Sequence, residues 1–291
     1  MYYKTKAYRL FSSCNYLFLA LLAFLCLLPL IHTLALSFSG RAPANANLVG
    51  LWPVDFTFDA YKKTFNNPNF LHSIRISLLR TLIGTASGML MIFLAAYPLS
   101  KSNLVFKSRS VYSWFFIMTM LFNGGLVPNY IVVQKLGLMN SIWALILPVS
   151  VSVWLLVLML NFFRNVPKEL EEAALMDGAS QPRILFMIFL PISMPAVATL
   201  SLFMMVFHWN SWFDGLIYIT DSSKYPLSTF LHTILIQIDA TQLSSGRDME
   251  NISNQTVKAA QIFIGALPIL LVYPFLQRYF VKGIVLGSVK E

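Results

Sequence analysis

Residues 164–183 read RNVPKELEEAALMDGASQPR, and this stretch holds four of the twelve acidic residues of the chain. Its local chemistry predicts two short helices around a turn. Asn165 is a residue type that caps helices, and Pro167 suits a first helical turn, with the glutamates that follow near the positive helix end. Gly178 suits the left-handed position that ends a helix, and Ser180 can start the next one.

The first of these helices carries small side chains. Leu170, Ala173 and Ala174 are three and four residues apart, which predicts that they share one face. A small-residue face on an exposed helix suits close docking in a groove of another protein. A solvated connector is an equally good interpretation of the local chemistry alone.

The sequence on both sides of this stretch is apolar. Of the 291 residues, 57% are hydrophobic and only 11% are charged, less than half the charge of a typical soluble domain. A membrane-spanning helix needs about 20 mostly apolar residues. Six segments meet this condition: Tyr16–Leu36, Ile76–Tyr97, Val111–Val132, Ile142–Phe163, Ile184–Phe207 and Ala259–Phe280. The third is interrupted by Asn123-Gly124-Gly125 and Pro128.

The first apolar segment has an alternative interpretation as a signal peptide, because a basic stretch precedes it. Its apolar part, Tyr16–Leu36, is longer than the roughly 7–15 residues of a signal-peptide core. We therefore interpret it as a retained span.

The distribution of charge predicts the orientation. With the N-terminus in the cytoplasm, twelve of the 21 basic residues fall in cytoplasmic segments, so the positive-inside rule favours both termini inside. The net charge of +9 is then mainly an orientation signal and does not require nucleic acid. All twelve acidic residues lie outside the six segments, which argues against a proton-coupled carrier.

The 164–183 stretch also matches a spaced pattern. Glu172-Ala173-Ala174, three residues, Gly178, nine residues and Ile188-Phe189-Leu190-Pro191 fit EAA-x3-G-x9-I-x-L-P at every fixed position. This resembles the signature of the membrane subunits of bacterial ABC importers. The resemblance implies an all-α, type I importer permease with six transmembrane helices and both termini inside, in the inner membrane.

Further segments resemble the carbohydrate-uptake members of this family. They are FNGGLVP at 122–128, LMNS at 138–141, WN at 209–210 and YPL at 225–227. The chain is most similar to the maltose-type inner-membrane subunit, and within that set to permeases for complex acidic oligosaccharides such as alginate. The resemblance covers residues 71–291, the transmembrane domain. Residues 1–70 then form an N-terminal tail, the first span and an outer loop.

The resemblance implies roles for the residues of the pattern. The helix in residues 165–180 would be the coupling helix, with Glu172 paired to a basic ATPase residue, Ala173 and Ala174 at close approach, and Gly178 at the turn. The chain has no phosphate-binding GxxxxGK[ST] motif, so ATP and Mg²⁺ would bind partner subunits and this chain would be neither enzyme nor cofactor carrier. The implied partners are a second permease subunit, two ATP-binding subunits and an extracytoplasmic binding protein.

The residues of a translocation path are less well defined. Arg80 lies inside the second span and would suit an acidic sugar, although snorkelling to the interface is the commoner explanation. Asn123, at the break of the third span, and Trp209 with Asn210, after the fifth, are the other predicted path residues. Trp209 equally suits an interfacial aromatic belt.

The outer loop at 209–256 is the longest connection. In the maltose-type subunit the matching loop reaches into the binding protein. By that resemblance Thr241, Ser245, Gly246 and Arg247 would contact a binding protein here, and the alternative is a disordered polar loop.

The sequence alone leaves two other functions open. An ion-coupled secondary transporter, driven by sodium, needs a discontinuous helix, and the break at Asn123–Pro128 offers one. An intramembrane enzyme needs a nucleophile or a metal cluster, and neither is visible. The four histidines show no paired spacing, so no metal site is predicted.

Overall fold

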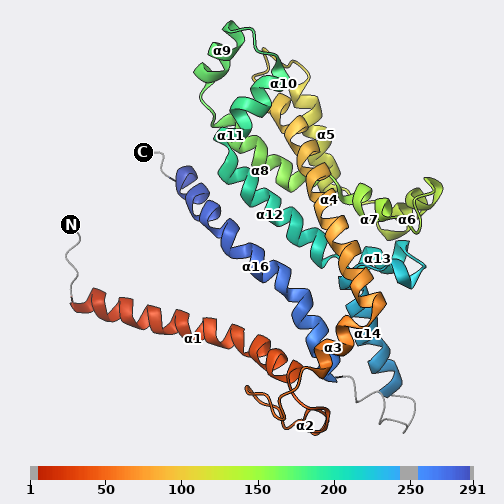
Figure 1. The fold of residues 1–291 in the computed structure, drawn as a ribbon. Helices are drawn as coiled ribbons and strands as arrows, with labels where there is room; N and C mark the ends of the chain where they lie inside the picture. The colour runs from red at the N-terminus through yellow and green to blue at the C-terminus, as the bar shows by residue number, and fades with distance from the viewer. Residues whose placement is uncertain (1–5, 243–254, 289–291) are drawn as a thin grey trace. The chain divides into compact units, whose positions relative to one another are not determined.

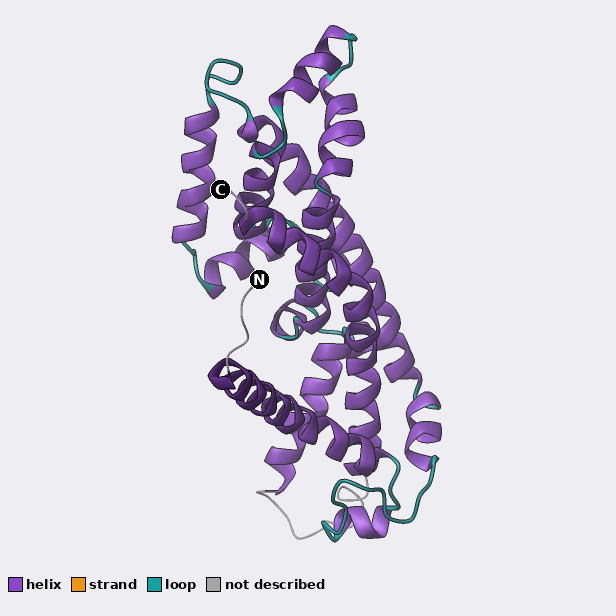
Figure 2. Ribbon diagram, turned by 90° about the vertical axis from the view of Figure 1, so that its left-hand side faces the viewer, coloured by secondary structure: helices purple, strands orange, loops and turns teal. Residues whose placement is uncertain are grey.

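The structure is a computed structural model that describes residues 6–242 and 255–288, and all regular structure in these ranges is helical (Figures 1 and 2), as predicted. In chain order the elements are α1 (Lys6–Ser37), α2 (Arg41–Asn45), α3 (Asp59–Phe65), α4 (Pro68–Ser100), α5 (Arg109–Leu121), α6 (Leu126–Lys135), α7 (Ile142–Ile146), η1 (Leu147–Val149), α8 (Val153–Arg164), α9 (Lys168–Met176), α10 (Gln181–Ile184), η2 (Leu185–Phe189), α11 (Leu190–Ile192), α12 (Met194–Asn210), α13 (Phe213–Tyr218), η3 (Ser222–Lys224), α14 (Leu227–Gln242) and α16 (Gln255–Ser288).

The chain divides into two compact units, which are described separately. The first unit takes in Met1–Phe70 and Thr233–Leu267, and the second takes in Leu71–His232 and Pro268–Glu291. The long helix α16 therefore contributes to both.

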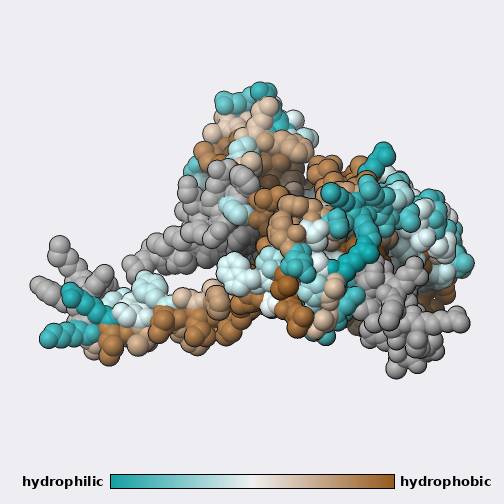
Figure 3. Space-filling view, turned by 60° about the horizontal axis from the view of Figure 1, so that its bottom comes forward, coloured by the Kyte–Doolittle hydropathy of each residue, from teal (hydrophilic) through white to brown (hydrophobic). Residues whose placement is uncertain are grey.

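The first unit is built around α1 and the loop that follows it. A band of hydrophobic side chains runs along α1 (Figure 3), and most residues of this helix are exposed. At the end of α1, the Phe38 ring stacks on Phe56 and Tyr61, with ring centroids 5.3 and 4.7 Å apart. The hydroxyls of Ser37 and Tyr61 are 2.8 Å apart. These contacts fold residues 38–61 back onto the end of α1.

The second unit has its core where α4, α8 and α12 meet. Fully buried side chains of this core include Ile92, Leu156 and Leu200. Gly84 and Gly88 lie one turn apart on α4, a spacing that lets membrane helices approach closely. A Cβ at Gly84 would lie 2.5 Å from the His208 ring, and one at Gly88 would lie 2.6 Å from the Ser150 carbonyl oxygen.

Three helices among the described residues are long and apolar enough to cross a membrane. They are α1, α4 and the described, sufficiently apolar part of α16, Gln255–Val272. Three bent helix pairs meet the same conditions if each is taken as one span, which gives up to six spans. The number is compatible with the six predicted segments.

Three of the predicted spans are bent, including the third, whose interruption the sequence predicts. The predicted third span divides into α5 and α6, which meet at 114°, because Asn123-Gly124-Gly125 interrupts the helix and Gly125 adopts φ +85°. The predicted fourth span bends by 52° after Val149. These breaks place irregular backbone inside segments that are long and apolar enough to span a membrane.

The predicted fifth span is bent as well, by 87° between Ile192 and Met194. Pro191 and Pro195 flank this bend, and the five residues Leu185–Phe189 form a π-helical stretch before it. A proline has no backbone N–H to donate and clashes with the preceding turn, so both prolines favour the break. The Ile188–Pro191 part of the sequence pattern thus lies at the bend.

Candidate functional site

The 164–183 stretch forms α9, a turn and α10. The cap of α9 is Pro167, and Asn165 ends the preceding helix α8, so the predicted capping role of Asn165 is wrong. At the other end Gly178 has φ +73°, and the Ala179 and Gly178 amides donate to the carbonyls of Ala174 and Leu175 at 2.9 and 3.0 Å. This pair of bonds is a Schellman motif, which requires the left-handed conformation that glycine adopts without strain.

The two alanines of the pattern lie in different surroundings. Ala174 is buried against the core of its own unit, whereas Ala173 and Glu172 are exposed. The prediction that Leu170, Ala173 and Ala174 share a docking face is therefore wrong for Ala174, because successive residues point about 100° apart around a helix. The exposed large apolar side chains of α9 are Leu170, Leu175 and Met176, which are 43%, 45% and 88% exposed.

A lysine that follows α4 holds α9 in place. Lys101 Nζ lies 2.6 Å from Glu171 Oε1 on α9, and both side chains are largely buried. The same ammonium group lies 3.8 Å from the centroid of the Tyr97 ring and 4.3 Å from that of the Phe189 ring. Burial lowers the pKa of Lys101, and the hydrogen bond and charge of Glu171 oppose this shift.

A second bond joins α4 to the start of α10. The Tyr97 hydroxyl donates to Gln181 Oε1 at 2.6 Å, and the Tyr97 and Phe189 rings meet edge to face at 5.0 Å. The end of α4 is thus bonded to segments on both sides of the Gly178 turn. Neither Lys101 nor Tyr97 belongs to the sequence pattern, and no local signal in the sequence marks them.

The position of Arg80 differs from both positions that the sequence suggested, which were a translocation path and the membrane interface. Its side chain is fully buried and forms an ion pair with Asp214 on α13. Its guanidinium group also donates to the carbonyl oxygens of Ser211, at 3.0 Å, and Leu145, at 3.3 Å. Arg80 neither snorkels to an interface nor faces an open path in this conformation. A charge inside an apolar segment requires such a partner, but the sequence alone does not choose among the outer acids.

The other predicted path residues are not gathered into one site. Trp209 is 6% exposed, and its carbonyl oxygen accepts a hydrogen bond from the Ser228 hydroxyl. Asn210, the last residue of α12, is exposed. Asn123 is exposed too, and its Oδ1 accepts the Gly125 amide at 3.0 Å. A contact of these residues with a transported molecule stays a prediction.

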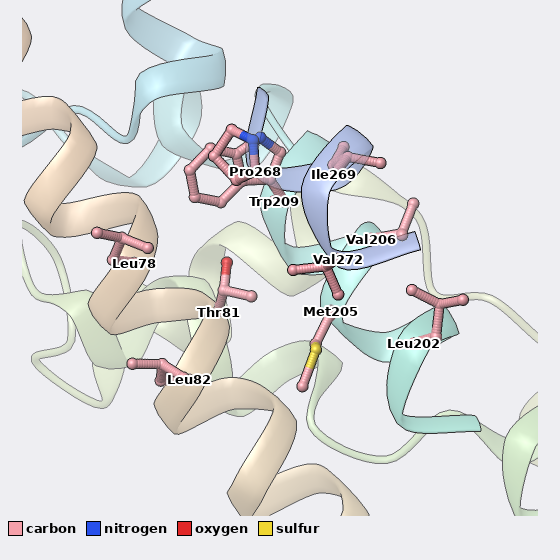
Figure 4. A pocket seen from close by; sticks show the side chains of 10 residues that line it. All are labelled: Leu78, Thr81, Leu82, Leu202, Met205, Val206, Trp209, Pro268, Ile269 and Val272. Carbon is pink, nitrogen blue, oxygen red and sulfur yellow. The ribbon is translucent and has the colours of Figure 1, made fainter. Parts of the chain in front are cut away.

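Trp209 lines a cavity of about 140 Å³ between α4, α12 and α16 (Figure 4). Apolar side chains form most of its wall, and Thr81 lies in it as well. Such a lining suits an apolar ligand group better than the hydroxyls of a sugar.

The predicted binding-protein loop is only partly described. Residues 209–242 are largely helical, in α13, η3 and α14, rather than a disordered polar loop. Thr241 lies in α14, and Ser245, Gly246 and Arg247 lie outside the described residues. Among the described residues, no group of three or more His, Cys, Asp and Glu side chains is arranged to hold a metal ion.

Comparison with known proteins shows which family the chain resembles. Residues 82–286 match the family described as the binding-protein-dependent transport system inner membrane component. The chain is 42% identical to the Protein LplC of Bacillus subtilis over 99% of this chain and 97% of the relative. It is 41% identical to the polygalacturonan/rhamnogalacturonan transport system permease protein YtcP of the same species, over 97% and 99% of the two chains.

A solved structure is similar along the whole chain. It is a chain of a bacterial ABC transporter involved in the import of the acidic polysaccharide alginate, with a TM-score of 0.86 and 28% identity over 96% of this chain and all of the other. The resemblance to ABC importer permeases that the 172–191 pattern predicts is thereby confirmed. The chain belongs to the family of inner-membrane components of binding-protein-dependent transport systems.

Proposed function

We propose that this chain is the permease subunit of an ATP-driven importer and forms half of a path for an oligosaccharide. An extracytoplasmic binding protein delivers the oligosaccharide, and two ATP-binding subunits supply the energy. A second, similar permease subunit forms the other half of the path.

The observation that carries this proposal is α9. It is a short helix between two segments of membrane-spanning length, with an exposed face of Leu170, Ala173 and Met176 and a glycine turn at its end. Exposed apolar side chains on a short helix suit a groove of a partner protein. The placement of α9 on the cytoplasmic side follows from the positive-inside rule.

The proposed substrate class is an oligosaccharide rich in uronic acids. Two similar proteins support it: the 41% identical permease is named for polygalacturonan and rhamnogalacturonan, and the similar structure belongs to an alginate importer. All three polymers carry carboxylates on sugar rings. The binding protein would read most of this specificity, since Arg80 of this chain is already paired with Asp214.

The experiment is reconstitution of the chain with its candidate ATP-binding and permease partners in liposomes. Oligogalacturonate, alginate oligomers and a neutral maltodextrin serve as probes, each with the binding protein. We expect ATP-dependent uptake of one acidic probe and inhibition by vanadate. Uptake of maltodextrin alone would overturn the substrate class, and uptake without ATP hydrolysis would overturn the importer.

An ion-coupled secondary transporter is the alternative, and the 114° break between α5 and α6 favours it. Unwound backbone at such a break can coordinate a sodium ion. In the same liposomes a sodium gradient without ATP separates the two functions, because only the secondary transporter would then accumulate sugar.

A further inference from the structure

The Lys101 side chain has an unusual setting for a lysine at the end of a membrane-length helix. Such a lysine ordinarily extends its ammonium group into water. Here the side chain is only 8% exposed, and its ammonium group lies against the rings of both Tyr97 and Phe189 with Glu171 as counter-ion. A lysine charge in this position is held by specific partners rather than by solvent.

The partners of Lys101 come from three separate segments. Tyr97 belongs to α4, Glu171 to α9 and Phe189 to η2, the π-helical part of the bent fifth segment. The hydrogen bond from Tyr97 to Gln181 is a second link between α4 and the segment that follows α9. One ammonium group thus connects the exposed helix α9 with two of the long segments that would line the path.

The other charged groups around this point do not replace Lys101. Arg164, Lys168 and Glu172 line the same cavity of about 240 Å³, which Lys101 and Glu171 also line. Glu172 is exposed, in contrast to Glu171, and so is Lys168. The buried ion pair between Lys101 and Glu171 is therefore the charged contact that ties α9 to α4.

We propose that Lys101 is a positioning residue that transmits displacement of α9 to α4 and to the bent fifth segment. The proposal rests on the proposed function, in which an ATPase moves α9. When α9 moves, either Lys101 moves with Glu171 or a largely buried lysine charge is left against two aromatic rings without its counter-ion. Because the second outcome is unfavourable, the two elements move together.

The test compares Lys101→Met, Lys101→Arg and Glu171→Gln in the reconstituted importer, with Lys107→Met as the matched control. Lys107 is an exposed lysine of the same connection between α4 and α5. The readouts are co-purification of the ATP-binding subunits, basal ATP hydrolysis, and the ATP hydrolysed per molecule of oligogalacturonate or alginate oligomer imported.

We expect Lys101→Met and Glu171→Gln to keep the partners bound and to raise the ATP consumed per imported molecule about fivefold or more, a typical size for a lost coupling. Lys101→Arg keeps the charge and should stay near wild type, and so should Lys107→Met. The double variant of Lys101→Met and Glu171→Gln should be no worse than either single one, because both remove the same contact.

A normal ratio of hydrolysis to import in Lys101→Met overturns the proposal, as do additive effects in the double variant. If the Lys101→Met variant does not fold, the Glu171→Gln variant tests the proposal, because this substitution keeps the side-chain volume of residue 171 and removes only its charge. Failure of the wild-type chain to recruit an ATPase overturns the proposed function itself. That failure is seen before any variant is compared.

Discussion

Arg80 on α4 and Asp214 on α13 form an ion pair in which the arginine side chain is fully buried and the aspartate is 19% exposed. The two residues are 134 positions apart in the sequence. The same guanidinium group donates to the Ser211 and Leu145 carbonyl oxygens, so it holds together α4 and the segments around α7 and α13.

Removal of one partner of this pair should destabilise the protein strongly. Arg80→Met leaves Asp214 without its counter-ion. Breaking a buried ion pair lowers the free energy of unfolding by about 3–5 kcal/mol, and we expect a value at the low end of this range because Asp214 is partly exposed. We expect a lower Tm of the detergent-solubilised protein. Arg75→Met, which removes an exposed arginine of the same helix, should leave the Tm nearly unchanged.

The double variant Arg80→Met/Asp214→Leu tests the pair as such. Replacing both charges by apolar groups should restore most of the Tm lost in Arg80→Met, because no unpaired charge is left. A double variant as unstable as the single one would show that the bonds of Arg80 to the two carbonyl oxygens, not the ion pair, carry the effect.

The close approach of α4 to its neighbours depends on Gly88. A Cβ there would lie 2.6 Å from the Ser150 carbonyl oxygen and 2.7 Å from Met204 Cε. The backbone oxygen cannot rotate away, so Gly88→Ala should cost about 1–3 kcal/mol. Gly50→Ala is the control, since no atom lies within 4 Å of its Cβ position. Equal Tm values for the two variants would contradict this packing.

The turn after α9 depends on the backbone conformation of Gly178. Its φ of +73° strains any L side chain, although no atom lies within 4 Å of the Cβ position. Gly178→Ala should cost about 1–2 kcal/mol, and Gly178→Asn less, because asparagine tolerates this conformation. We expect Gly178→Asp to insert in the membrane and to fail in oligosaccharide uptake. Normal uptake by this variant would contradict the role of the turn in coupling.

The exposed face of α9 should bind the ATPase. Met176→Lys places a charge on its most exposed apolar side chain and should reduce co-purification of the ATP-binding subunits without a change in Tm. Leu104→Lys is the matched control, because Leu104 is 91% exposed in the neighbouring connection. Equal loss of the ATPase in both variants would mean that added charge, rather than the face of α9, disturbs assembly.

Local properties of the sequence were enough to predict much of this protein. The apolar segments follow from the transfer of side chains out of water, and the end of α9 at Gly178 follows from the conformational freedom of glycine. The pattern from Glu172 to Pro191 identified the family, since its spacing lies within one short stretch. These features depend on neighbours in the chain, which the sequence displays directly.

Only the tertiary structure decided how those segments meet. It paired Arg80 with Asp214 rather than with lipid headgroups or substrate, and it buried Ala174 in the core while Ala173 stayed exposed. It also placed the Lys101 ammonium group against the rings of Tyr97 and Phe189. Each of these outcomes depends on which elements pack together across long distances in the chain. A buried charge requires a partner, but only packing determines which one it finds.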